Sequence, residues 1–378
     1  MNPGISIVIC TYNGAGRLRE TVRHIARQQV RRTIPWELIL IDNNSTDDGV
    51  SLVQDEWSSL RASVPLIIRQ QPLQGLAMAR EMGIRTARYE YVILCDDDNW
   101  LSPDYVNTAY DSMSQNPRIG ILGARGELVY EAVPDPWLLR LNLLAGGAQA
   151  ASSGKVHSHR VYGAGCVLRK SAYQLLVEVN FKFMLSDRSG AQLTSGGDHE
   201  LCYILALCNY EIWYNENLRF KHYITRERLT WDYWVRYVRE SSACNNVLEP
   251  YRMILNGARP TQSGFHKHLI KNFAYFFIRF LPVSFSRWIF GSRSAAGKLN
   301  YLKYILLREQ LQNCLWHFAM KKNFFLISSL KKELQEKVTI TDRSLSVNHQ
   351  LLMVQAFSCW MLLLESFLQA QSIVVSLL

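Results

Sequence analysis

In YVILCDDDN, residues 91–99, five apolar residues are followed directly by three aspartates. A short, continuous apolar run of this kind predicts a strand that is buried on both faces. Three earlier runs share this character: Ile5–Cys10, Trp36–Ile41 and Pro65–Arg69. Stretches of helical length lie between the runs, at residues 17–29, 47–60 and 76–87. The alternation predicts an α/β fold with a mainly parallel sheet and helices on both of its faces.

Polar clusters follow three of the predicted strands at the point where each strand ends. The clusters are Thr11–Gly14, Asp42–Ser45 and Asp96–Asn99. In open α/β sheets, ligands bind beyond the carboxyl ends of the strands, so we expect these clusters to form one site. Ser45 or Thr46 is also the expected N-cap of the following helix, because two aspartates come next.

The aspartates at positions 96–98 predict a metal site. Three adjacent carboxylates repel one another unless a cation compensates them. Mg²⁺ commonly joins one or two carboxylates to the phosphates of a substrate. The alternative is an acidic turn that caps the next helix, which Ser102 and Pro103 could begin. The two neighbouring polar clusters favour a metal–diphosphate site.

Four further residues could serve such a site. Asp42 could accept hydrogen bonds from a ribose or a base, and Arg80 could pair with a phosphate or with the aspartates. Asp198 opens the apolar run Leu201–Leu207, where it could be a helix cap or a general base. His222 could be a metal or phosphate ligand, although a lone histidine is usually structural.

The charge of the 378-residue chain is unevenly distributed. Residues 251–378 hold 16 Lys and Arg against 5 Asp and Glu, whereas residues 1–250 hold 26 against 27. A basic segment indicates an anionic partner or a solvated surface. The cations in Leu269–Phe290 alternate with aromatic rings, which favours an element lying on an anionic membrane over a nucleic-acid partner. We expect Pro282 to break a helix there.

Cysteine usage and the two ends of the chain bear on its location. Eight cysteines without a C-x-x-C pair indicate buried thiols in a reduced compartment. The first residues lack a signal-peptide pattern, so we expect a cytoplasmic protein. Residues 351–378 are apolar, but Glu365 and other polar residues form a stripe. This pattern predicts an amphipathic helix rather than a spanning one.

Taken together, these segments resemble the family 2 inverting glycosyltransferases, which have the Rossmann-like GT-A fold. The resemblance covers about residues 4–225. It rests on five motifs in the family's order: SIVICTYN (6–13), IDNNSTD (41–47), GLAMAR (75–80), DDDN (96–99) and GDHEL (197–201). Gly197 stands where the family usually has a glutamate before the base. The Gln-x-x-Arg-Trp motif of polymerising members is absent from the sequence. The chain therefore resembles members that add a single sugar.

The resemblance also implies roles for particular residues. It implies a metal-assisted direct displacement in which a nucleotide-sugar donor, with a uridine nucleotide expected, gives its sugar to a hydroxyl of a glycan or lipid-linked acceptor. The residues implied to bind the donor are Thr11, Tyr12, Asn13, Asp42, Asn44, Gly75, Arg80, Asp96 and Asp97. Asp98, Asp96 and His222 would hold Mn²⁺ or Mg²⁺, and Asp198 would be the general base.

The expected organisation has three parts. Residues 1–228 form a GT-A domain with a nucleotide-binding half (1–122) and an acceptor half (123–228). A basic, aromatic-rich helical extension (229–345) and an apolar tail (346–378) follow, and they place the protein on the inner face of the cell membrane. Two alternatives stay open: a nucleotidyltransferase of similar fold, and a non-catalytic protein that binds nucleotide sugars or membranes.

Overall fold

The computed structural model describes residues 2–62, 64–141, 143–188, 192–290 and 294–337, and it comprises two units, Met1–Ser329 and Leu330–Leu378. The strands are β1 (Asn2–Thr11), β2 (Trp36–Asp42), β3 (Leu66–Gln70), β4 (Tyr89–Asp96), β5 (Asn99–Leu101), β6 (Ile119–Tyr130), β7 (Gly154–Lys155), β8 (Val167–Arg169) and β9 (Glu211–Ile224). The labelled helices are α1 (Ala15–Ala26), α2 (Gly49–Ser59), α3 (Leu76–Thr86), α4 (Tyr105–Gln115), α5 (Lys170–Glu178), α6 (Gly197–Leu207), α7 (Trp231–Ser241), α8 (Asn245–Leu255), α9 (Gln262–Phe290) and α10 (Ala295–Leu315), and residues 318–337 are helical as well. Three short 3₁₀ turns are η1 (Leu138–Arg140), η2 (Arg226–Leu229) and η3 (Ser242–Cys244).

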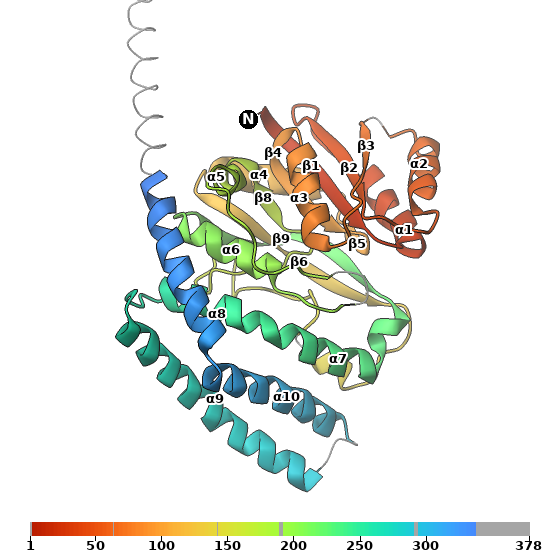
Figure 1. Ribbon diagram of the computed structural model, residues 1–378. Coiled ribbons are helices and arrows are strands. Elements are labelled where there is room, and N and C mark those ends of the chain that lie inside the picture. Colours follow the sequence, from red (N-terminus) through yellow and green to blue (C-terminus); the bar gives the residue numbers. More distant parts are fainter. Residues whose placement is uncertain (1, 63, 142, 189–191, 291–293, 338–378) are drawn as a thin grey trace, which may run out of the picture. The chain divides into compact units, whose positions relative to one another are not determined.

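One sheet runs through the first unit in the order β3-β2-β1-β4-β8-β6-β9-β5, with β7 paired to β9 (Figure 1). The strands β3, β2, β1 and β4 are parallel, which confirms the predicted α/β fold. Thr11 pairs with Asp42, and Cys10 pairs with Asp96, so the predicted polar clusters share one edge. Beyond β4 the sheet is mixed: β8 is antiparallel to β4 and β6, while β6 and β9 are parallel.

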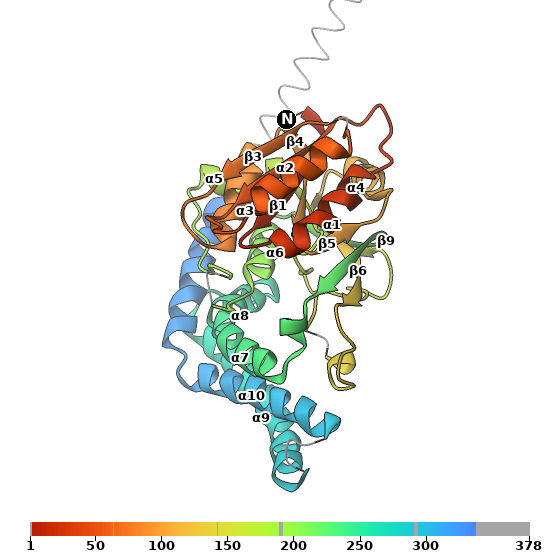
Figure 2. The same ribbon diagram turned by 90° about the vertical axis from the view of Figure 1, so that its right-hand side faces the viewer.

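Helices cover both faces of the parallel half. Helices α1 and α2 lie side by side on one face (Figure 2). Ile5, Ile7 and Ile9 share one large apolar core with residues of α1, α2 and α4. Val8 points to the other face, against α3. There Gly83 lets the helix approach closely, because a Cβ at this position would lie 2.3 Å from Cγ1 of Val8. This contact fixes the helix that carries Arg80.

The helices after residue 228 pack on the earlier part of the chain. Trp234 and Val238 of α7 and Leu302 and Ile305 of α10 share an apolar cluster with Trp137. Helix α8 contacts α6, where Tyr251 stacks on Tyr203 with the ring centroids 6.1 Å apart. These contacts close one side of the site described below.

Helix α9 runs without interruption through Pro282, so the prediction that this proline breaks the helix is wrong. The helix packs along α10 (Figure 1). It leaves apolar side chains exposed, including Ile278, Phe285 and Trp288. Among the described residues, the structure contains no helix that has both the length and the apolar character to cross a membrane. The predicted apolar tail, residues 346–378, lies outside the described residues.

Candidate active site

A cavity of about 1220 Å³ opens at the carboxyl ends of β1 and β4 and at the first turns of α3 and α6. The predicted site residues that line it are Thr11, Tyr12, Gly75, Arg80, Asp96, Asp97, Asp98, Asp198 and His222. Asp42 ends β2, and Asn13 and Asn44 lie in the loops that follow β1 and β2, beside the cavity. The cavity therefore brings together residues from the first and the second half of the domain.

The two loops beside the cavity use their polar side chains to hold one another. Asp42 Oδ1 accepts a hydrogen bond from the backbone N–H of Ser45 (3.0 Å). Asn13 Oδ1 accepts one from the N–H of Thr46 (2.8 Å), and Asn13 itself has a left-handed φ of 50°. Buried Asn43, which sequence reasoning did not single out, accepts from the N–H of Gly75 (2.8 Å). These bonds shape the rim next to β1 and β2.

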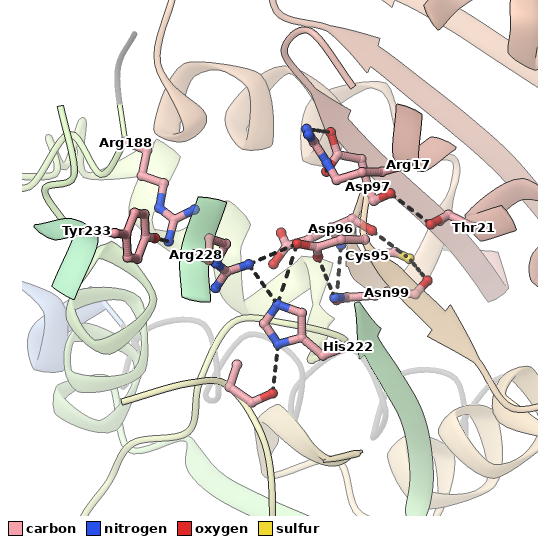
Figure 3. Close-up of polar contacts among 12 residues, drawn as sticks. Arg17, Thr21, Cys95, Asp96, Asp97, Asn99, Arg188, His222, Arg228 and Tyr233 are labelled. Carbon is pink, nitrogen blue, oxygen red and sulfur yellow. Dashed lines mark hydrogen bonds and ion pairs between the residues drawn. The ribbon is translucent and has the colours of Figure 1, made fainter. Parts of the chain in front are cut away.

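The three adjacent aspartates have three different sets of partners, of which Figure 3 shows the pair of Asp97 and Arg17. Asp97 accepts two hydrogen bonds of 2.9 Å from the guanidinium of Arg17 and one of 2.8 Å from the hydroxyl of Thr11. Asp96 Oδ1 accepts from Arg80 (3.1 Å). Asp98 accepts from the amide of Asn99 (2.9 Å) and from Arg228 (3.1 Å). The sequence did not reveal Arg17 and Arg228, which are distant from the aspartates along the chain.

Burial and the neighbouring cations act on these carboxyls in opposite directions. Burial raises the pKa of Asp97, and Arg17 offsets only part of that effect. Burial would also raise the pKa of Asp98, but His222 and Arg228 reverse it and hold that pKa well below its usual value. Asp98 is therefore the more firmly ionised of the two.

Asp98 and His222 form a pair of side chains that could act as ligands of a cation. His222 Nε2 lies 3.5 Å from Asp98 Oδ2, and His222 Nδ1 is 3.0 Å from the carbonyl oxygen of Ala145. When the ring is neutral, Nδ1 donates to that carbonyl and leaves a lone pair on Nε2. Within the described ranges, three or more His, Cys, Asp or Glu do not gather as a metal-binding group. The pair still fits Mn²⁺ or Mg²⁺, because such ions take few protein ligands when a diphosphate supplies the others.

Asp198 lies at the first turn of α6 and faces the same cavity. Its Oδ2 accepts from the N–H of Gly163 (2.8 Å), and its Oδ1 accepts from the N–H of His199 (2.8 Å). Burial would raise the pKa of Asp198, but His199, Arg80 and these N–H groups lower it overall. Asp198 is therefore ionised at neutral pH, and each oxygen keeps a further lone pair for a hydroxyl proton.

Two more carboxyls lie near Asp198, and only one of them reaches the cavity. Asp187, which the sequence did not single out, lines the cavity and contacts Arg80 (3.5 Å). Burial is the main reason that the pKa of Asp187 rises to about 6. Glu200 is fully buried and accepts from the N–H groups of Met184 (3.0 Å) and Leu185 (2.9 Å), so it is placed to hold a loop.

Comparison with sequence families gives one match over the first half of the chain. Residues 6–176 match the family described as Glycosyl transferase family 2. Glycosyltransferase GlyG of Streptococcus pneumoniae is 28% identical over 123 residues, which are 32% of this chain and 39% of that protein. The uncharacterized glycosyltransferase YwdF of Bacillus subtilis is 33% identical over 103 residues, which are 27% of this chain and 35% of that protein. This chain thus spans less than half the length of these curated relatives.

Comparison with solved structures supports the fold. The mannosyltransferase PcManGT of Pyrobaculum calidifontis, solved in complex with GDP-Man and Mn²⁺, is 15% identical and has a TM-score of 0.50. The superposition covers 84% of this chain and 88% of that chain. At this level of identity, the likeness shows a shared fold and nothing about the substrate.

Proposed function

We propose that this chain, which belongs to glycosyl transferase family 2 through residues 6–176, moves one sugar from a nucleotide-diphosphate sugar to an acceptor hydroxyl with inversion at the anomeric carbon. The observation that carries this proposal is that the aspartates at 96–98 and Asp198 line one cavity. A direct displacement needs a site for the leaving diphosphate and a base for the attacking hydroxyl. The cavity offers a candidate for each.

The donor would bind at the carboxyl ends of β1, β2 and β4. The hydroxyl of Thr11 donates a hydrogen bond to Asp97 there, and exposed Tyr12 is the next residue in the chain. A divalent cation held by Asp98, Asp96 and His222 would neutralise the diphosphate as a Lewis acid. The solved relative named above carries Mn²⁺ with a guanosine nucleotide, whereas we expect a uridine nucleotide here.

Asp198 would take the proton from the acceptor hydroxyl. Its ionised carboxylate is held by two backbone N–H groups, so it keeps a fixed orientation toward the cavity. Arg80 bridges Asp96 (3.1 Å) and Asp187 (3.5 Å), which places a fixed positive charge between the donor side and the base. This charge would favour the negative charge that develops on the leaving group.

Part of the cavity lining is apolar, and we assign this part to the acceptor. It includes Leu139, Leu141, Leu143, Leu144 and Leu306. Arg160 and Arg252 line the cavity as well. An acceptor with an apolar part and an anionic group suits such a wall, which supports a lipid-linked or otherwise amphipathic glycan acceptor. We accordingly place the enzyme at the surface of an anionic membrane, on its cytoplasmic face.

The test is a donor screen on the full chain. UDP- and GDP-linked sugars are each incubated with and without Mn²⁺, and the release of the nucleoside diphosphate is measured. We expect Mn²⁺-dependent release that Asp98→Ala abolishes, while Asp111→Ala, which removes an exposed carboxylate on α4, leaves it unchanged. Release of inorganic diphosphate from a nucleoside triphosphate would instead identify a nucleotidyltransferase. Binding of a nucleotide sugar without turnover would identify a non-catalytic protein.

A further inference from the structure

Arginines of this chain compensate the carboxylates that line the cavity. Arg17 pairs with Asp97 (2.9 Å), and Arg80 pairs with Asp96 (3.1 Å). Arg228 pairs with Asp98 (3.1 Å). The repulsion that three adjacent carboxylates would otherwise suffer is thus relieved by guanidinium groups. A metal ion that enters this cluster has to compete with one of them.

Arg228 is the arginine that a metal ion would meet between Asp98 and His222. Its Nη1 lies 3.1 Å from Asp98 Oδ2 and 3.2 Å from His222 Nε2, and these two atoms are themselves 3.5 Å apart (Figure 3). One nitrogen of the guanidinium therefore bridges the same two atoms that suit a divalent cation. The backbone of Arg228 is held at η2, where its carbonyl accepts from the indole N–H of Trp234 (2.8 Å).

The guanidinium of Arg228 is incompletely satisfied in this position. Its Nε is buried and has no hydrogen-bond partner in the described part of the chain. A buried donor without a partner is unfavourable, because it has given up its hydrogen bonds to water. Guanidinium groups bind phosphate oxygens through two parallel N–H bonds, which would satisfy Nε together with one Nη. The side chain is thus suited to exchange Asp98 for an anionic ligand.

We propose that Arg228 is a positioning residue that occupies the cation position between Asp98 and His222, and that a divalent cation binds there only when Arg228 leaves. A guanidinium and a divalent cation repel each other and cannot share one carboxylate oxygen. Metal alone therefore binds weakly, because it has to displace an internal cation. A diphosphate offers the released guanidinium a new partner, so metal and diphosphate bind together. The purpose of this exchange rests on the proposed function, whereas the competition itself does not.

The competition is tested with Mn²⁺ alone, without nucleotide or sugar. Free and bound Mn²⁺ are separated by electron paramagnetic resonance in titrations of the full-length wild type, Arg228→Met and Arg226→Met. We expect Arg228→Met to bind Mn²⁺ roughly 10- to 100-fold more tightly than wild type, the equivalent of one hydrogen bond to a charged group. Arg226 is exposed on the same 3₁₀ turn, so its variant removes one charge without emptying the position and should bind like wild type.

Two further variants locate the effect. Adding Asp98→Asn to Arg228→Met should remove the gained affinity, because Asp98 is the shared ligand. Arg228→Gln replaces Arg228→Met if circular dichroism shows that the methionine variant is unfolded. Equal or weaker Mn²⁺ binding by the folded Arg228 variant, or an equal gain in Arg226→Met, would overturn the inference. A negative donor screen combined with the expected Mn²⁺ result would reject the proposed function and leave the competition standing.

Discussion

At the scale of single residues, Gly197 has a role that only the structure reveals. A Cβ at this position would lie 2.4 Å from Oδ2 of Asp187, and the N–H of Gly197 donates to Oδ1 of Asp187 (2.6 Å). The carboxylate of Asp187 therefore occupies the place that a side chain at position 197 would take. Members of the family that the chain resembles usually have a glutamate at this position, directly before the base. The structure places a different carboxylate there, from a loop ten residues earlier in the chain.

The assignment of the base predicts a specific kinetic loss. Asp198→Asn keeps the shape of the side chain but loses its basicity. Turnover should fall by roughly 10²–10⁴-fold, the usual share of a general base, while donor affinity in calorimetry stays near wild type. Asp187→Asn is the comparison, because Asp187 lines the same cavity and also contacts Arg80. A larger loss of turnover in Asp187→Asn than in Asp198→Asn would move the role of base to Asp187.

Glu200 makes the stability of the protein depend on pH. Burial is the main cause that raises its pKa to about 7, against 4.5 for an ordinary glutamate. The folded protein therefore holds this proton more tightly, and the stabilisation is lost as the pH rises through 7. Between pH 5 and pH 8, this group should lower the free energy of unfolding by about 2–3 kcal/mol. Urea denaturation at both pH values should show a smaller pH dependence in Glu200→Gln; an unchanged dependence would contradict this origin.

At the scale of elements, the sequence predicted the strands of the parallel half well and the helix starts less well. The predicted strand Trp36–Ile41 differs from β2 by one residue. Helix α2 begins at Gly49, and the expected caps Ser45 and Thr46 instead bind the loop after β1. Apolar runs identify buried strands because burial depends on local composition. Caps are harder to predict, because a nearby loop from elsewhere in the chain can take the same side chain.

The candidate site also has a part that the sequence predicts and a part that it does not. Motifs at strand ends could be placed from the sequence, since parallel strands end at a common edge. Two of the arginines that contact these motifs could not be predicted, because Arg17 and Arg228 lie 80 and 130 residues from the aspartates that they contact. Tertiary contacts of this length leave no local pattern. The sequence therefore predicted that a cation compensates the cluster and singled out Arg80, which pairs with Asp96, but it did not identify Arg17 and Arg228.

Two helix glycines should respond differently to replacement by alanine, because Gly83 of α3 packs against β1 and Gly16 of α1 is exposed. Gly83→Ala should lower the free energy of unfolding by about 1–3 kcal/mol, because its Cβ would overlap Val8 in a close-packed layer. Gly16, in α1, is exposed, and a Cβ there would have no neighbour within 4 Å. Gly16→Ala should be neutral or stabilising by up to about 1 kcal/mol, through helix propensity alone. Urea denaturation of both variants is the measurement, and a stable Gly83→Ala would show that the α3–β1 contact is loose.

At the scale of the whole molecule, α9 carries both basic residues and exposed apolar side chains. The helix lies in the basic last third of the chain, and Ile278 (68%), Phe285 (63%) and Trp288 (82%) are largely exposed on it. Two of its cations stack on rings: Arg279 lies 4.3 Å from the ring centroid of Tyr275, and Arg287 lies 4.2 Å from that of Tyr304. Exposed apolar side chains beside cations are the composition that binds the interface of an anionic bilayer.

This surface predicts membrane attachment with an electrostatic part, which salt weakens, and an apolar part, which salt does not weaken. Each basic residue near an anionic leaflet contributes about 1 kcal/mol, and salt screens that part, whereas burial of the apolar side chains persists at high salt. The full chain should float with anionic vesicles at low salt and float partly at high salt. The combined change Ile278→Ser, Phe285→Ser and Trp288→Ser should abolish the salt-resistant part only.

The matched control replaces three exposed apolar residues outside α9, Val133, Trp316 and Phe318, with serine. Failure of the wild type to float at low salt, or equal loss in the control, would exclude α9 as the anchor and leave its apolar face for a protein contact.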